Sequence, residues 1–152
     1  MSGVMYRSIV VGTDGSDTAR EAVRQAGELA NAVGGNVLLV SAYEPVPESR
    51  LQQVRDNVPA DVSWMVNPRQ AAQGVLDDEA ERLKAGGVSD VEIYAREGNP
   101  ADAILDVAEE KEADLIVVGS KGMTGARRLL LGSVPNTVSH HARCNVMIVR
   151  TA

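Results

Sequence analysis

Apolar positions follow two alternating patterns along the chain. Short, nearly continuous apolar runs, typical of strands buried on both faces, occur at residues 6–12, 36–43, 113–119 and 145–149, and residues 88–96 predict one further strand. Between these runs, apolar residues recur at steps of three and four, which predicts helices with one buried face at residues 19–33, 72–83, 100–108 and 134–141. The chain therefore alternates strand and helix from end to end.

This alternation predicts a single doubly wound α/β domain over residues 1–152. Right-handed crossovers place all five strands parallel, with helices on both faces of the sheet, and we expect the strand order 3-2-1-4-5. One connection departs from the pattern: residues 44–66 hold three prolines and no clear period, apart from a short helix that residues 49–57 could form.

The predicted strand order locates a candidate site. In open α/β sheets, ligands bind beyond the carboxyl ends of the strands, at the point where the strand order reverses. Strands one and four flank that point, and both end in glycine followed by polar residues: Gly12-Thr13-Asp14 and Gly119-Ser120-Lys121. We expect the two strand ends to form one crevice.

The stretch from Gly119 to Ser133 has the composition of a phosphate-binding loop. Its glycines let backbone N–H groups approach a ligand, and it leads into a predicted helix, whose N-terminus favours anions. Its spacing fits neither the GxxxxGK[ST] loop nor the GxGxxG fingerprint. The alternative is an ordinary connection in which Ser133 caps the helix.

Asp14 also has two interpretations. Its carboxylate could accept a hydrogen bond from a ribose hydroxyl or an adenine amine, or it could cap the following helix with Asp17 as a capping-box partner. Thr13 and Ser16 have the same two readings. No arrangement of nucleophile, base and acid is evident from the sequence. We interpret His140 and His141 as favourable charges at a helix C-terminus and Cys144 as inert packing.

Composition and charge narrow the class of ligand. The chain has one Trp, three Tyr and no Phe, which leaves few platforms for stacking nucleic-acid bases. Residues 115–152 carry five basic side chains and no acidic one, although the net charge of the whole chain is −6. A locally positive tail on an acidic body indicates a small anionic ligand and disfavours nucleic acid.

The expected location follows from the same sequence. It contains no apolar run long enough to span a membrane and no readable signal peptide. Its single cysteine cannot form an internal disulfide, which fits a reducing compartment. We expect a cytoplasmic protein that does not bind membranes.

Three separated matches, in the right order, resemble the ATP-binding branch of the universal stress protein family. That branch has the motif G-x2-G-x9-G-[S/T], which Gly119, Gly122, Gly132 and Ser133 fit without a gap. The first strand with its acidic turn, residues 9–16, and residues 131–134 also look like the corresponding family segments. The resemblance covers essentially the whole chain, and implies a Rossmann-like fold related to the adenine nucleotide α-hydrolases.

The resemblance also implies roles for individual residues. Asp14 would lie on the ribose or adenine side of a bound ATP, and Ala42 would meet adenine through its backbone. Pro135 stands where some relatives carry a polar residue. The full set of nucleotide-binding residues that it implies is Gly12, Thr13, Asp14, Ala42, Val118, Gly119, Gly122, Gly132, Ser133 and Val134.

The function that we expect is a cytoplasmic stress-response regulator that binds ATP, with the need for Mg²⁺ left open. No general base or nucleophile is apparent beside the loop, so we expect a switch of conformation or partner, not an enzyme, although slow ATP hydrolysis is compatible with this. The alternatives are a cyclic AMP-binding module, an enzyme of the nucleotide α-hydrolase type, and an interaction protein without nucleotide.

The family resemblance further implies a homodimer formed through the last strand. Residues 146–149 are uncharged and lack proline, and the predicted order leaves this strand at an edge of the sheet. An open apolar edge is an aggregation hazard that a partner strand removes. The alternative is that the tail or a loop covers this edge.

Overall fold

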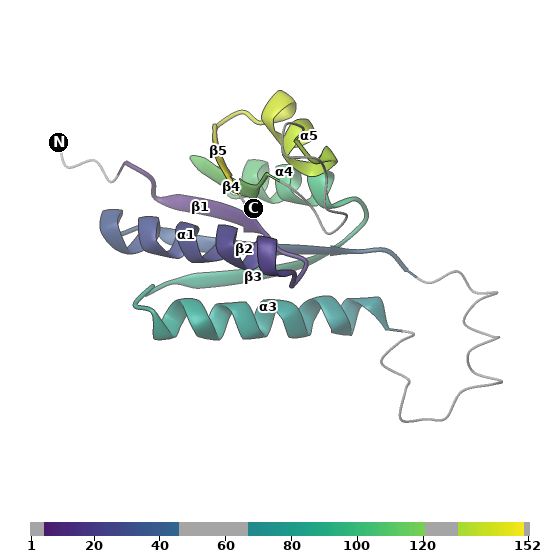
Figure 1. Ribbon diagram of the computed structural model, residues 1–152, viewed down its shortest axis with the longest axis horizontal. Helices are drawn as coiled ribbons and strands as arrows, with labels where there is room; N and C mark the ends of the chain where they lie inside the picture. The colour runs from purple at the N-terminus through teal and green to yellow at the C-terminus, as the bar shows by residue number, and fades with distance from the viewer. Residues whose placement is uncertain (1–4, 46–66, 121–130, 151–152) are drawn as a thin grey trace.

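The computed structural model describes residues 5–45, 67–120 and 131–150 and contains one parallel sheet with the strand order β3-β2-β1-β4-β5 (Figure 1). The predicted doubly wound α/β fold and its strand order are confirmed. Along the chain the elements are β1 (Ser8–Gly12), α1 (Asp17–Val33), β2 (Asn36–Tyr43), α3 (Pro68–Ala85), β3 (Val91–Glu97), α4 (Pro100–Glu110), β4 (Leu115–Gly119), α5 (Ser133–His141) and β5 (Asn145–Val149).

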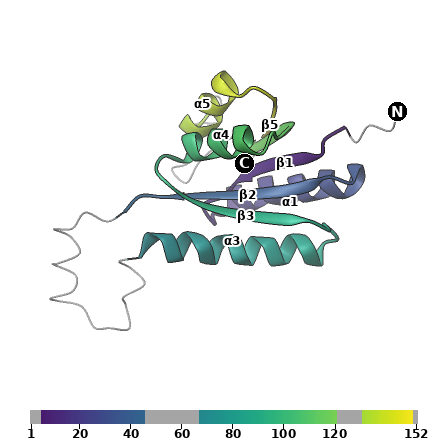
Figure 2. The same ribbon diagram turned by 180° about the vertical axis from the view of Figure 1, so that it is seen from behind.

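Helices cover both faces of the sheet, as Figure 2 shows from behind. On one face, α1 and α3 pack against strand residues that include Ile9, Val11, Val37, Leu39, Leu115 and Val117. On the other face, α4 and α5 pack against Val10, Leu38, Val40, Ile116 and Val118. The three central residues of β1, Ile9, Val10 and Val11, alternate between the two cores and are inaccessible to solvent, which explains the continuous apolar sequence there.

Some predicted strands were too long at their ends, because side chains or helix ends accept hydrogen bonds from the backbone amides there. The first strand begins at Ser8 and not at Tyr6, since Asp114 accepts hydrogen bonds from the amides of Arg7 and Ser8, at 2.9 and 3.1 Å. The third strand begins at Val91, because the amide of Val88 donates to a carbonyl in the last turn of α3. The predicted short helix at 49–57 lies outside the described residues.

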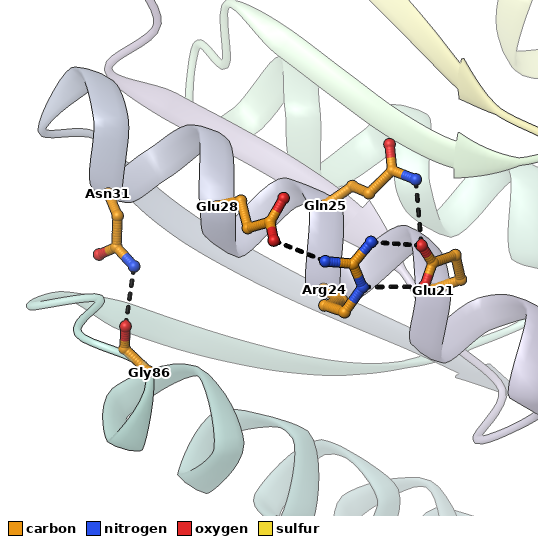
Figure 3. Close-up of polar contacts among 6 residues, drawn as sticks. All are labelled: Glu21, Arg24, Gln25, Glu28, Asn31 and Gly86. Atoms are coloured by element: carbon orange, nitrogen blue, oxygen red, sulfur yellow. Dashed lines mark hydrogen bonds and ion pairs between the residues drawn. The ribbon is translucent and has the colours of Figure 1, made fainter.

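The solvent-facing side of α1 carries a chain of polar contacts (Figure 3). The Arg24 guanidinium donates to Glu21 and also to Glu28, one turn on either side. The hydrogen bonds that the Glu21 carboxylate accepts lower its pKa to about 2. At the end of the helix, the Asn31 side chain donates to the Gly86 carbonyl oxygen at 2.9 Å, which ties α1 to the end of α3. The two helices on this face are therefore joined by polar contacts as well as by their core.

Among the described residues, no helix combines the length and the apolar character that crossing a bilayer requires.

The turn from α1 into β2 requires a residue without a side chain at Gly35. An added Cβ there would overlap the backbone carbonyl oxygen of Tyr6. The chain passes this closely because the Asn36 amide donates to the Arg7 carbonyl at 2.8 Å, where β2 begins to pair with β1. The close approach is thus part of how the two strands enter register.

Replacing Gly35 with alanine is expected to lower the free energy of unfolding by about 1–3 kcal/mol, because a backbone oxygen cannot rotate away from the new methyl group. Gly74 provides the control. It lies in α3, with no neighbour within 4 Å of an added Cβ, so Gly74→Ala should raise stability by roughly 0.5–1 kcal/mol. Urea unfolding followed by circular dichroism measures both, and two changes of the same sign would contradict the close approach.

Candidate functional site

A crevice opens at the carboxyl ends of β1 and β4, between the first turns of α1, α4 and α5. Its volume is about 830 Å³ with the open mouth included. Its walls are formed by Gly12, Thr13, Asp14, Ser16, Thr18, Ala19, Val40, Ala42, Pro100, Ile104, Val118, Gly119, Gly132, Ser133, Val134 and Pro135. The crevice lies where the order of the strands reverses.

Nine of the ten residues singled out by sequence lie in the wall of this one crevice. They come from four separate segments: the β1–α1 turn, the end of β2, the end of β4, and the start of α5. The tenth, Gly122, lies outside the described residues, as do Lys121, Arg127 and Arg128. Sequence reasoning thus brought together segments that are more than 100 residues apart.

The β1–α1 turn is held by its own side chains. Thr13 Oγ1 accepts a hydrogen bond from the Gly15 amide at 3.1 Å, and Asp14 Oδ1 accepts one from the Ser16 amide at 2.9 Å. The N-cap of α1 is Ser16, whose Oγ accepts from the Ala19 amide. The interpretation of Asp14 as the helix cap is therefore wrong: it stabilises the turn two residues earlier, and its side chain is exposed at the crevice.

The opposite wall begins at the end of β4 and continues into α5. The Ser120 amide donates to the Val149 carbonyl, and the Gly132 amide donates to the Ser120 carbonyl, at 2.8 and 2.9 Å. Gly132 is the N-cap of α5, with no side-chain hydrogen bond, and Ser133 is the first helical residue. The alternative that Ser133 caps this helix is thus wrong. The first-turn amides of α5 have no partner within the helix and lie at its positive end.

The start of α4 forms the third wall and was not assigned to the site by sequence. Its N-cap, Asn99, accepts hydrogen bonds from the amides of Ala101 and Asp102, at 2.8 and 3.4 Å. Pro100 and Ile104 line the crevice from this helix. The available signal was that Asn99 and Pro100 follow the carboxyl end of a strand, as the other two segments do. The apolar period of residues 100–108 predicts only a buried helix face, and Ile104 belongs to that face as well as to the crevice wall.

The chemistry of the crevice is that of a binding site for a polar, largely uncharged or anionic group. Thr13, Ser16, Thr18 and Ser133 contribute hydroxyl groups, and Asp14 is the one charged side chain among the described lining residues. Within residues 5–45, 67–120 and 131–150, no group of three or more His, Cys, Asp or Glu could hold a metal ion. No His or Cys side chain is among the described residues of the wall.

The remaining candidates lie away from the crevice. His140 and His141 form the last turn of α5, as predicted, with His140 Nδ1 2.8 Å from the Asn136 carbonyl oxygen. Cys144 precedes β5 at the opposite end of the sheet and packs against the core beside α4 and α5. Burial, and secondarily the charge of Asp114, raise the pKa of its thiol, which agrees with a packing role.

The chain is similar over almost its whole length to one group of proteins. The model of the universal stress protein family matches residues 5–150. Universal stress protein Rv1636 of Mycobacterium tuberculosis is 38% identical over 146 residues, covering 96% of this chain and 97% of that protein. A crystal structure described as a universal stress protein in complex with cAMP matches with a TM-score of 0.73 and 35% identity, over 97% of this chain and 99% of that one. The universal stress protein of Archaeoglobus fulgidus in complex with dAMP matches with a TM-score of 0.66 and 25% identity, over 95% and 98%.

Gly12 connects the crevice to the core, and its packing can be tested by a double-mutant cycle. An added Cβ would lie 2.5 Å from Ile104 Cδ1, so Gly12→Ala should lower the free energy of unfolding by about 1–3 kcal/mol. Ile104→Val removes that methyl group, at a cost of roughly 0.5–1.5 kcal/mol by itself. In chemical unfolding, the double variant should lose less free energy of unfolding than the two single variants lose together. Strict additivity would mean that the two groups do not meet.

Proposed function

The chain belongs to the universal stress protein family, and from this premise we propose that it binds an adenine nucleotide in the crevice at the ends of β1 and β4. The observation that carries the proposal is the start of α5. Its first-turn amides border the crevice without a side-chain cap, whereas Ser16 and Asn99 cap the other two helices. Free amides at a helix N-terminus are suited to binding phosphate.

The walls of the crevice suit the other parts of a nucleotide. At the β1–α1 turn, Asp14 uses Oδ1 within the turn and is exposed, so its second oxygen can accept a hydrogen bond from ribose or adenine. Ala42 follows the run of buried residues in β2 and borders the crevice, where its backbone can meet the base. Val40, Ile104 and Val118 provide an apolar surface for the ring.

Two adenine nucleotides are candidate ligands. ATP is the ligand implied by the G-x2-G-x9-G-[S/T] motif, with or without Mg²⁺. Cyclic AMP is the second candidate, because the structure of a family member bound to cAMP is 35% identical to this chain over nearly its full length. ATP and cyclic AMP differ in the number of phosphates and in the number of free ribose hydroxyls. Direct titration with each ligand therefore distinguishes the two candidates.

We propose a regulatory role in the cytoplasm, in which the bound nucleotide alters conformation or partner choice without turnover. General acid–base catalysis needs a side chain that can exchange a proton near neutral pH. Among the described lining residues the titratable side chain is Asp14, whose carboxylate is already hydrogen-bonded within the turn. ATP consumption at enzyme-like rates by the purified protein would contradict this role.

We also propose a homodimer in which β5 of each chain pairs with its partner. The fifth strand is at the edge of the sheet, next to β4 alone. Since the Val149 carbonyl points toward β4, and the N–H and C=O of one residue point to the same side of a strand, the backbone groups of Val146 and Ile148 point to the open edge. An uncharged edge with open donors and acceptors favours strand pairing.

A matched pair of substitutions at Ser133 tests the nucleotide site. Ser133→Asp places a negative charge where the phosphate would bind, and should weaken the binding of ATP and cyclic AMP by about tenfold or more. The same charge is favourable at the start of a helix, so the fold should be as stable as before. The side chain introduced by Ser133→Asn has nearly the size of aspartate but carries no charge. Isothermal titration, with and without Mg²⁺, measures each affinity.

The controls for this test are the neutral variant and a ligand without phosphate. Ser133→Asn should bind both nucleotides within a few fold of the unmodified protein, and adenosine should bind all three proteins alike. If Ser133→Asp binds ATP and cyclic AMP as tightly as Ser133→Asn does, the phosphate does not lie at the start of α5. If folded protein binds neither nucleotide, the proposed function itself is wrong.

The proposed dimer predicts a particle of twice the 16.1 kDa chain mass. Sedimentation equilibrium or light scattering after gel filtration should give this mass at micromolar concentration, because pairing satisfies the open backbone groups of β5. A chain that stays monomeric across this range would contradict the pairing.

A further inference from the structure

We propose that Pro135 makes the crevice select adenine nucleotides with a single phosphate over those with a triphosphate. This inference rests on the proposed nucleotide site and names the class of ligand that the site prefers. It depends on three features of the described residues: the donors that α5 offers, the charge of the crevice wall, and the place of Pro135 in that wall.

The start of α5 offers two backbone donors. Gly132 at the N-cap uses its amide on the Ser120 carbonyl, and the Asn136 amide donates to the Gly132 carbonyl as the first hydrogen bond of the helix. Between them, the first-turn amides of Ser133 and Val134 have no hydrogen-bond partner among the described residues. The next position holds Pro135, which has no N–H to donate. A first turn usually presents a third amide here, and this one does not.

Pro135 lies within the site. It borders the crevice and is buried, although Ser133 beside it is exposed. Its ring therefore gives the wall an apolar surface at the position of the third first-turn amide. Two amides and the Ser133 hydroxyl remain, which suits the oxygens of one phosphate group. The outer phosphates of a triphosphate would find a ring in place of a donor.

The charge of the described wall favours the same class of ligand. No Lys or Arg is among the lining residues within the described parts of the chain, and Asp14 contributes a negative charge. One phosphate carries at most about two negative charges near pH 7. A triphosphate carries more, and each added charge requires compensation by a cation or by further donors. The described wall therefore compensates the charge of a single phosphate more completely than the charge of a triphosphate.

The decisive experiment restores the missing amide. Pro135→Ala adds an N–H at the third helical position and retains a good helix former, so the variant should fold. Isothermal titration with cyclic AMP, AMP and ATP gives the ratio of affinities for each protein. The unmodified chain should bind the single-phosphate ligands more tightly than ATP, and Pro135→Ala should shift the ratio toward ATP by roughly tenfold, as expected for a hydrogen bond to a charged group.

Pro68→Ala is the matched control. Pro68 also stands in the first turn of a helix, α3, but it is not among the residues that form the crevice wall. This variant should leave the ratio between ATP and the single-phosphate ligands unchanged within about twofold. Pro135→Ser, which also restores the amide, serves if the alanine variant does not fold, and should shift the ratio in the same direction.

The outcomes separate this inference from the proposed function. If the unmodified protein binds adenine nucleotides, but neither Pro135 variant changes the ratio, or Pro68→Ala changes it as much, the inference is wrong and the nucleotide site remains. The same conclusion holds if the unmodified protein prefers ATP. If folded protein binds none of the three ligands, the proposed function is wrong and the inference falls with it.

Discussion

The pairing of β1 with β4 at the centre of the sheet is the constraint on which the rest of the molecule depends. The chain leaves β1 for α1 on one face, and it leaves β4 for α5 on the opposite face. Because the two connections lead to opposite faces of the sheet, neither of them covers the space between the ends of β1 and β4. An opening at that place is therefore a consequence of the topology, present whatever side chains line it.

The same packing that stabilises the domain also shapes the opening. Ile104 contributes to the core beneath α4 and at the same time forms part of the crevice wall, directly against Gly12. Val40 and Val118 likewise belong to both the core and the crevice wall. Because these residues are fixed by the close packing of the interior, the wall is held in place before any ligand arrives. The shape of the crevice and the stability of the fold thus depend on some of the same contacts.

Sequence patterns were sufficient for the fold and for most of the crevice, because strand order and strand ends follow from hydrophobic periodicity and the handedness of crossovers. They were not sufficient for the starts of α1 and α5. Asp14, Ser16 and Ser133 are all good capping residues, and which of them caps depends on backbone angles that the fold imposes: Ser16 is extended at φ −72° and ψ 162°, and Gly132 takes the corresponding position before α5. Ile104 was assigned to the core alone because a helical period does not show that a buried face continues into a cavity.

The uncapped start of α5 has a consequence for how this molecule can change over evolutionary time. Donors that belong to the main chain are carried by nearly every amino acid, so random substitution at Ser133 or Val134 leaves them in place. Proline is the exception, since it alone deletes a backbone donor while still permitting a first helical turn. A lineage can therefore drift widely in side chains without losing these donors, and can delete one of them in a single codon change.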